Sequence, residues 1–170
     1  GLSTAQIGVI YGTFGTVAFV LGSLLAGYYI AKRGLKKALM VLVASFNIPF
    51  IVFAFLSSSQ PDNLYIITAA VTFEYLGYGF GFVGLMLFMM QQVAPGKYKM
   101  AHYAFATGIM NLGFMIPSML SGYFSDMLGY KVYFIWVLVA TIPVFLAAYF
   151  VPFGHLDNKE QLELENSTTK

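Results

Sequence analysis

Long apolar runs, separated by short polar breaks, dominate the chain from end to end. A helix needs about 20 apolar residues to cross a bilayer core about 30 Å thick, and each run is close to this length or longer. The pattern therefore predicts an all-α, polytopic membrane protein in which residues 1–153 form the membrane part and residues 154–170 form a polar cytoplasmic tail. The five predicted membrane-spanning helices are residues 5–31, 38–57, 64–91, 103–124 and 132–151.

The composition supports this class, because 59% of the residues are hydrophobic and only 9% are charged. The chain contains no cysteine, which excludes disulfides, thiolate metal sites and cysteine nucleophiles. Its two histidines, His102 and His155, both lie outside the predicted membrane core, so they form no metal site. The net charge of +2 is small and the basic residues stand at segment ends, which argues against nucleic acid as a partner. We expect no cofactor.

Basic residues distinguish the two sides of the membrane. Cytoplasmic loops of membrane proteins carry an excess of lysine and arginine. The predicted topology places one lysine, Lys131, outside and eight basic residues inside: Lys32, Arg33, Lys36, Lys37, Lys97, Lys99, Lys159 and Lys170. We therefore expect a multi-pass protein of the cytoplasmic membrane with its first residues outside and its carboxyl terminus in the cytoplasm.

The third predicted helix contains Glu74, the only acid expected at membrane depth, followed by a glycine-rich run. A carboxylate in hydrocarbon costs about 2.5 kcal/mol or more, so it should face a cavity, a partner or a pathway. The glycines permit bending or close helix approach. One interpretation is a pore-lining helix with Glu74 in a substrate or proton pathway. The alternative is a helix packed through its glycines, with a neutral, hydrogen-bonded acid.

Further polar groups share helical faces with these features. Tyr78 lies four residues after Glu74, which brings its phenol within reach of the carboxylate. Asn111 and Ser118 lie on one face of the fourth helix, and Tyr11 of the first helix could face a cavity. Their hydrogen-bonding groups suit either a substrate or another helix. We predict that all five residues belong to a substrate or proton pathway, and that none is catalytic.

The segment GYYIAKRGLKK at 27–37 resembles the glycine-and-basic loop G-x-x-x-D-R-x-G-x-K of the major facilitator superfamily. Position 31 is alanine where that pattern has aspartate, so the role attached to the aspartate does not transfer. The resemblance implies a gating loop at the residues that fit the pattern: Gly27, Gly34, Lys36 and Lys37. A glycine at a helix end permits a sharp exit, and lysines favour a helix C-terminus.

The order EYLGYGFGF at 74–82, with GIMNLGFMIPSMLSGYFSDMLGYKVYF at 108–134, is similar to the peptide/acetyl-CoA transporter branch of that superfamily, and within it to the muropeptide permeases. The resemblance implies helices 8–12 of a twelve-helix porter, whose N-terminal half would be the missing partner. It also implies proton-coupled import of anhydro-muropeptides or related amino-sugar compounds during cell-wall recycling. The expected partners are thus a small-molecule substrate, protons and membrane lipid.

Three alternatives remain open at the level of sequence. The first is a major facilitator porter for another sugar or small metabolite. The second is a membrane-embedded enzyme, although such enzymes usually show several carboxylates, histidines or a nucleophile pair at one depth. The third is a structural membrane subunit. The chain begins with Gly1 and not with methionine, and we interpret it as a portion of a longer protein.

Overall fold

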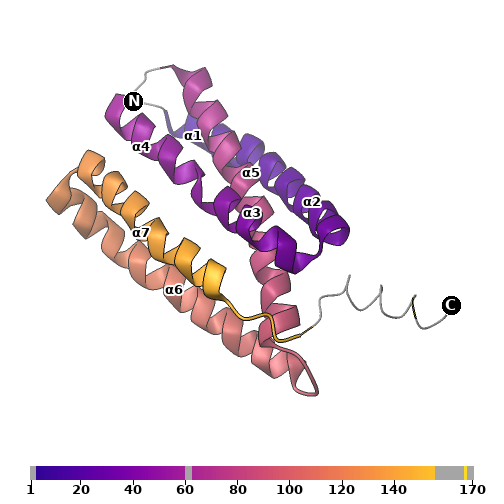
Figure 1. Cartoon of the computed structure of the whole chain (residues 1–170). Helices are drawn as coiled ribbons and strands as arrows, with labels where there is room; N and C mark the ends of the chain where they lie inside the picture. The colour runs from indigo at the N-terminus through magenta and orange to yellow at the C-terminus, as the bar shows by residue number, and fades with distance from the viewer. Residues whose placement is uncertain (1–2, 60–62, 156–166, 168–170) are drawn as a thin grey trace.

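The computed structural model describes residues 3–59, 63–155 and 167, and in these residues it is helical, without a strand. Five helical rods run side by side or in antiparallel pairs (Figure 1). Each is long and apolar enough to cross a membrane, which confirms the predicted fold class. The predicted tail at 154–170 lies mostly outside the described residues, as does most of the loop before the third rod.

The rods comprise nine elements. The first rod contains α1 (Thr4–Val9), η1 (Ile10–Gly15) and α2 (Thr16–Arg33), and the second contains α3 (Leu35–Asn47) and α4 (Pro49–Ser59). The third contains α5 (Leu64–Phe88) and η2 (Met89–Val93), and the last two are α6 (Lys99–Leu128) and α7 (Tyr130–Phe150). The elements η1 and η2 are π-helical turns, which are rare and often occur at functional sites.

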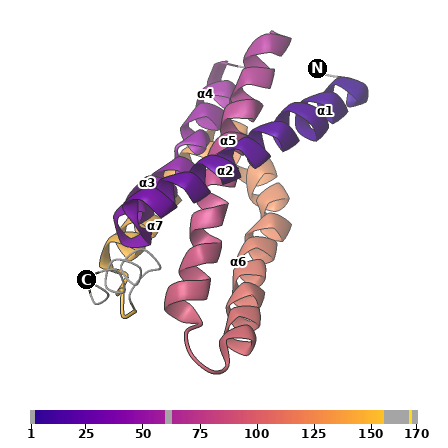
Figure 2. The same ribbon diagram turned by 90° about the vertical axis from the view of Figure 1, so that its right-hand side faces the viewer.

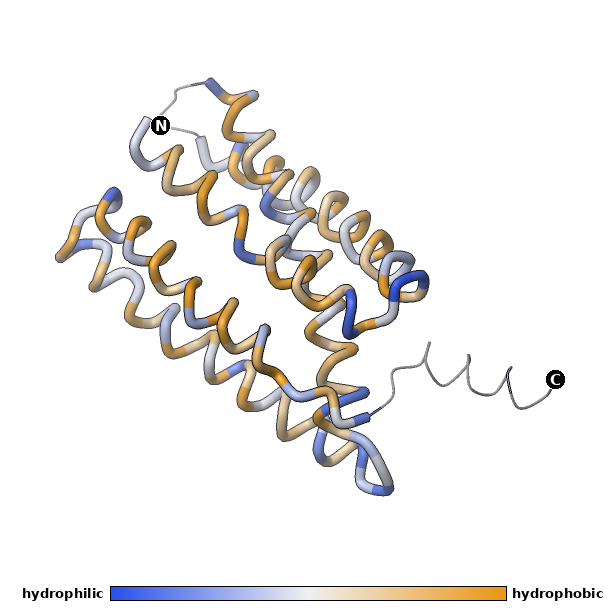
Figure 3. Tube along the Cα trace, viewed as in Figure 1, coloured by the Kyte–Doolittle hydropathy of each residue, from blue (hydrophilic) through white to orange (hydrophobic). Residues whose placement is uncertain are grey.

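The helices extend past most of the predicted spans because a helix continues beyond the hydrocarbon core into the interface, where polar residues are tolerated. The fourth rod, predicted at 103–124, begins at Lys99 and ends at Leu128, so it includes charged residues at both ends. Figure 3 shows the same pattern for the whole chain, with polar positions gathered at turns and rod ends and apolar positions along the rods.

The centre of the fold is the contact of α5 with α2. A side-chain carbon added at Gly22 would collide with the backbone of Leu76, and one added at Gly79 would collide with the backbone of Phe19. The two helices therefore approach each other through reciprocal glycines, as small residues allow in membranes. Figure 2 shows α2 crossing directly against α5.

On its other side α5 packs against α3. A side-chain carbon at Gly77 would meet the Ser45 carbonyl and Pro49, and one at Gly81 would meet Phe46. Pro49 has no N–H to donate to the Ser45 carbonyl, so the helix is interrupted at this point and α4 begins. The second rod is therefore interrupted where α5 packs against it.

The last two helices form a hairpin that packs less tightly than the rest. The α7 helix lies against α3 and α4, where the rings of Phe53 and Phe134 stack at 6.0 Å between centroids. The α6 helix packs mainly against η2 and α7, and of its residues only Ser125 is buried. Figure 2 shows α6 standing apart from α2 and α3. Most of the surface of α6 is therefore open to lipid or to another part of the protein.

Candidate functional site

Glu74 lies in the middle of a membrane-spanning rod. It follows the first residue of α5 by ten positions, which is about 15 Å along a helix. Its side chain is half-buried, and its Oε2 atom is buried without a hydrogen-bond partner. The α5 helix contains no lysine or arginine. The acid therefore has an unused hydrogen-bonding atom at membrane depth, as expected of a group that exchanges a proton or awaits a partner.

Two tyrosines accompany Glu74. The rings of Tyr11 and Tyr75 meet edge to face, with centroids 5.8 Å apart and planes at 74°. Tyr11 therefore lies against the residue that follows Glu74 in the chain. The π-helical turn η1 positions Tyr11, and at its end Gly15 leaves room for Tyr75, because a side-chain carbon there would lie 3.1 Å from the Tyr75 ring. Two rods thus contribute an acid and two phenols to one place.

The structure places Tyr11 against Tyr75, the chain neighbour of Glu74, and the role of Tyr11 in a pathway stays a prediction. Tyr75 was not predicted, because the one-turn spacing on a helix indicates Tyr78 and not a chain neighbour. Neighbouring residues on a helix do not face each other, yet both can lie beside a residue of a second helix. The available signal was the pair of adjacent side chains Glu74 and Tyr75, an acid followed directly by a phenol within the helix.

Tyr78 has different neighbours. Its ring lies 5.6 Å from Phe19 and 5.1 Å from Phe46, between α2 and α3. No hydrogen bond among the described residues joins Tyr78 to the free oxygen of Glu74. Its ring contacts two helices, so burying an aromatic surface determines its position more strongly than the one-turn spacing does. The structure therefore shows Tyr78 in an aromatic cluster, and its place in a pathway remains a proposal.

The polar residues of α6 stand apart from this group. Asn111 and Ser118 are both exposed, and the Ser118 hydroxyl donates to the carbonyl of Phe114, 2.8 Å away in the same helix. Among the described residues, no hydrogen bond or ring contact joins either side chain to Glu74. Asn111 thus presents its amide on the open side of α6, facing whatever covers that helix in the membrane.

The predicted gating loop is a tight corner between two helices. Gly34 has a φ of +80°, in the region that favours glycine, and it alone separates α2 from α3. Gly27 lies inside α2, well before the exit. The expectation that the lysines lie at a helix C-terminus is wrong for Lys36 and Lys37, because α3 begins at Leu35 and both stand in its first turn. There the helix dipole repels positive charge instead of favouring it.

A family model described as "Major Facilitator Superfamily" matches residues 1–169. The chain belongs to the Major Facilitator Superfamily. The superfamily consists of transporters, so the chain is part of a transporter and not of an enzyme. Within the described residues, no group of three or more histidine, cysteine, aspartate or glutamate side chains could hold a metal ion.

Relatives of the chain include proteins that are named as permeases or transporters. The chain is 24% identical to the anhydromuropeptide permease of Escherichia coli K12 over 84% of its own length and 29% of the permease. It is 21% identical to the putative transporter AmpG 1 of Rickettsia felis, over 84% of the chain and 31% of the relative. An uncharacterized protein of Haemophilus influenzae is 28% identical over 94% of the chain and 39% of the relative.

The chain therefore spans about a third of the length of these relatives. No solved structure matches it. The resemblance to AmpG-like members of the superfamily is confirmed at this level of similarity. The five apolar helices fit a part of a polytopic membrane protein of this superfamily.

Proposed function

We propose that this chain is the C-terminal part of a proton-coupled secondary transporter that imports anhydro-muropeptides or related amino-sugar compounds across the cytoplasmic membrane. Similarity to an anhydromuropeptide permease supports the substrate class. The observation that carries the coupling is Glu74, an acid at membrane depth with a buried oxygen and no hydrogen-bond partner for it. The N-terminal half of the transporter would supply the remaining helices and part of the substrate site.

Glu74 is the proton carrier in this proposal. Removal of an acid from water favours its neutral form, and the described residues offer its free oxygen no partner. Proton release then requires a pathway to water or a cation from the other half. In this proposal the nearby phenols of Tyr11 and Tyr75, whose rings meet beside the acid's position in the chain, hydrogen-bond the acid during transport. Two phenols beside one carboxyl provide donors for the charged state and acceptors for the neutral state.

The proposed orientation follows from the loops. The corner at Gly34 and the turn before α6 carry Lys32, Arg33, Lys36, Lys37, Lys97 and Lys99. Both lie at the ends of rods that point the same way, opposite the α6–α7 turn with Lys131 (Figure 1). The excess of basic residues assigns the first end to the cytoplasm. We therefore place the carboxyl terminus in the cytoplasm and the start of α1 outside.

The test is Glu74→Gln in the full-length transporter, reconstituted in proteoliposomes. Glutamine keeps the shape of the neutral acid but cannot release a proton. Substrate counterflow, which needs no net proton movement, should persist, whereas uptake driven by a pH gradient should be lost. Asp126→Asn, the same kind of replacement at the end of α6, is the matched control and should leave both activities unchanged.

Two results would contradict the role of Glu74. Normal uptake by both routes would make it a packing residue, and equal loss of both would make it a substrate ligand. Substrate identity is tested separately, by competition of unlabelled anhydro-muropeptides and of unrelated sugars against counterflow in the wild-type protein. Competition by other sugars alone would favour the alternative, a porter for another sugar or small metabolite.

A further inference from the structure

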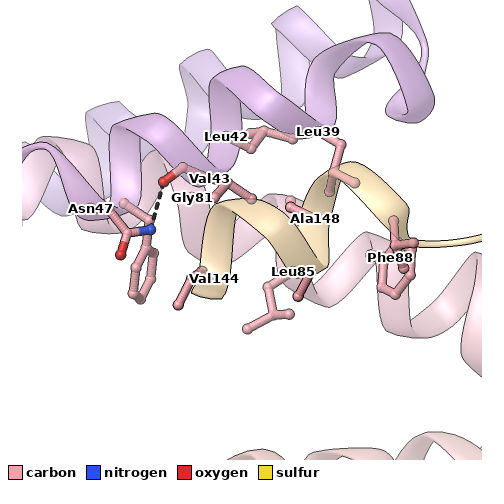
Figure 4. Close-up of a pocket in the computed structure, with 13 residues that line it drawn as sticks. Leu39, Leu42, Val43, Asn47, Gly81, Leu85, Phe88, Val144 and Ala148 are labelled. Carbon is pink, nitrogen blue, oxygen red and sulfur yellow. Dashed lines mark hydrogen bonds between the residues drawn. The ribbon is translucent and has the colours of Figure 1, made fainter. Parts of the chain in front are cut away.

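An apolar cavity of about 370 Å³ lies between α3, α5 and α7 (Figure 4). Side chains from all three helices line it, and Asn47 is the one polar residue among them. The Asn47 amide donates to the carbonyl of Val43, 2.8 Å away. That contact satisfies one polar group within its own helix. The cavity is thus suited to a hydrocarbon and not to a sugar or a peptide.

The cavity runs lengthwise along the helices. On α3 its lining extends from Leu39 to Asn47, which is about 12 Å at 1.5 Å per residue. The lining continues over Gly81–Phe88 of α5 and over Val144–Val151 at the end of α7. One leaflet of a bilayer core about 30 Å thick is about 15 Å deep. The cavity therefore begins near the Lys36 end of the bundle and reaches about as deep as one leaflet.

The helices around the cavity lie close together. The α3 and α7 helices are in contact, and Gly81 and Gly84 of α5 belong to the lining. A helix with its side chains is about 10 Å or more across, too wide for a slot between two helices in contact. A single extended chain is a better fit. An acyl chain is the extended apolar chain that a membrane supplies.

A positive charge stands at the mouth of this cavity. The ring of Phe153 packs edge to face on Phe88, a lining residue, with centroids 5.8 Å apart. The Lys36 Nζ atom lies 6.0 Å from the centre of the same Phe153 ring. Lys36 is exposed and precedes Leu39 by three positions, so both lie on the same face of α3. The apolar slot thus leads directly to a cation at its open end.

The chain beyond α7 is fixed beside this mouth. The Gln92 side chain donates from Nε2 to the His155 carbonyl at 2.8 Å and accepts at Oε1 from the His155 N–H at 3.2 Å. These two bonds hold the segment containing Phe153 against the end of η2. The mouth therefore has defined walls, and the position of Phe153 under Lys36 is supported by a second contact.

We propose that this cavity binds an anionic phospholipid from the leaflet on the Lys36 side, with one acyl chain in the slot and the phosphate headgroup at Lys36. Basic pockets between membrane helices on the cytoplasmic side bind anionic headgroups. Lys36 stands in the first turn of α3, where the helix dipole does not compensate its charge, so an anion there relieves the repulsion. The proposal is independent of the transported substrate.

The test uses native mass spectrometry of the purified full-length transporter, titrated with phosphatidylglycerol or phosphatidylcholine. The first binding step should favour phosphatidylglycerol. Lys36→Gln should weaken that step about five-fold, the effect of one lysine near an anionic surface. Ala148→Phe should fill the slot and weaken binding of both lipids. The matched controls are Lys131→Gln at the opposite end and Ala140→Phe on α7 outside the cavity lining.

Each outcome supports or overturns the lipid site. Selective loss in the two cavity variants, with unchanged binding in the controls, supports the lipid site. Equal binding of the two lipids by the wild type would overturn the anionic headgroup. Binding by both cavity variants that matches the controls would overturn the site, and would leave the cavity to a segment of the protein outside this chain. Lys36→Gln changes an exposed residue, so its effect on lipid binding does not depend on how the buried side chains pack.

Discussion

The hydroxyl of Ser23 in α2 donates to the backbone carbonyl of Gly79 in α5 across a distance of 3.3 Å. The same hydroxyl also lies 2.9 Å from the carbonyl of Phe19 in its own helix. A side chain as short as serine reaches the second helix only because Gly22 and Gly79 let the two backbones touch. The contact places a polar link inside an apolar interface one helical turn from the region of Glu74.

Gly79→Ala tests whether this close approach holds the transporter together. The added methyl would collide with the backbone of Phe19, which cannot move aside as a flexible side chain could. We expect a loss of about 1–3 kcal/mol in stability, measured by thermal unfolding in detergent. Gly113→Ala in α6, where the added methyl has open space, is the control. Equal melting temperatures for both variants would show that α2 and α5 separate readily.

Tyr11→Phe tests the phenol beside Glu74. The ring contact with Tyr75 should persist, while the hydroxyl is removed. We predict that this hydroxyl hydrogen-bonds the acid during proton transfer, so losing about 1 kcal/mol there should slow gradient-driven uptake about five-fold, with less effect on counterflow. Tyr28→Phe, at an exposed position of α2, should transport normally. If the two phenylalanine variants behaved alike, Tyr11 would have no part in proton transfer.

The orientation can be tested with single cysteines, since this chain contains none. Lys36→Cys and Asp126→Cys are introduced into a full-length protein made cysteine-free. An impermeant maleimide added to intact cells should label position 126 and leave position 36 unlabelled until the membrane is opened. The reverse pattern would invert the topology.

Asn111→Leu distinguishes a pathway residue from a packing residue on α6. The amide lies on an exposed face of the helix in this chain, so its partner must come from substrate, water or another part of the protein. We expect substrate uptake to fall while insertion and melting temperature change little. A variant that transports normally but melts at a lower temperature would show that Asn111 bonds another helix, at about 0.6 kcal/mol.

The length of the apolar runs was sufficient to predict the fold class. In lipid, a helix satisfies its backbone hydrogen bonds within one segment, which no other open-chain structure does. The precise helix ends were not visible. An apolar run indicates which residues lie in the hydrocarbon core and not where the helix ends. The α6 helix extends beyond its predicted span, from Lys99 to Leu128.

The candidate site was only partly predictable. A lone acid in an apolar helix was enough to predict Glu74 as a site residue. Its neighbours depend on how two rods cross, and the spacing of residues along one helix does not contain that information. The turn η1, which positions Tyr11, has the same composition as an ordinary membrane helix, so its π-helical geometry gave no signal. The glycines after Glu74 are compatible with both packing and pore lining, and only the contacts of Gly77, Gly79, Gly81 and Gly84 with α2 and α3 show that they pack.

The two hydrogen bonds between Gln92 and His155 join residues 63 positions apart, one before α6 and one after α7. They therefore close a loop of chain that contains both helices and hold the start of α6 near the end of α7. Near the opposite end, at the Gly129 turn, the stacked rings of Phe53 and Phe134 join the hairpin to α4. The hairpin is therefore attached to the bundle by polar contacts at its base and by aromatic contacts near its turn, so its two ends differ in what must break before either can move.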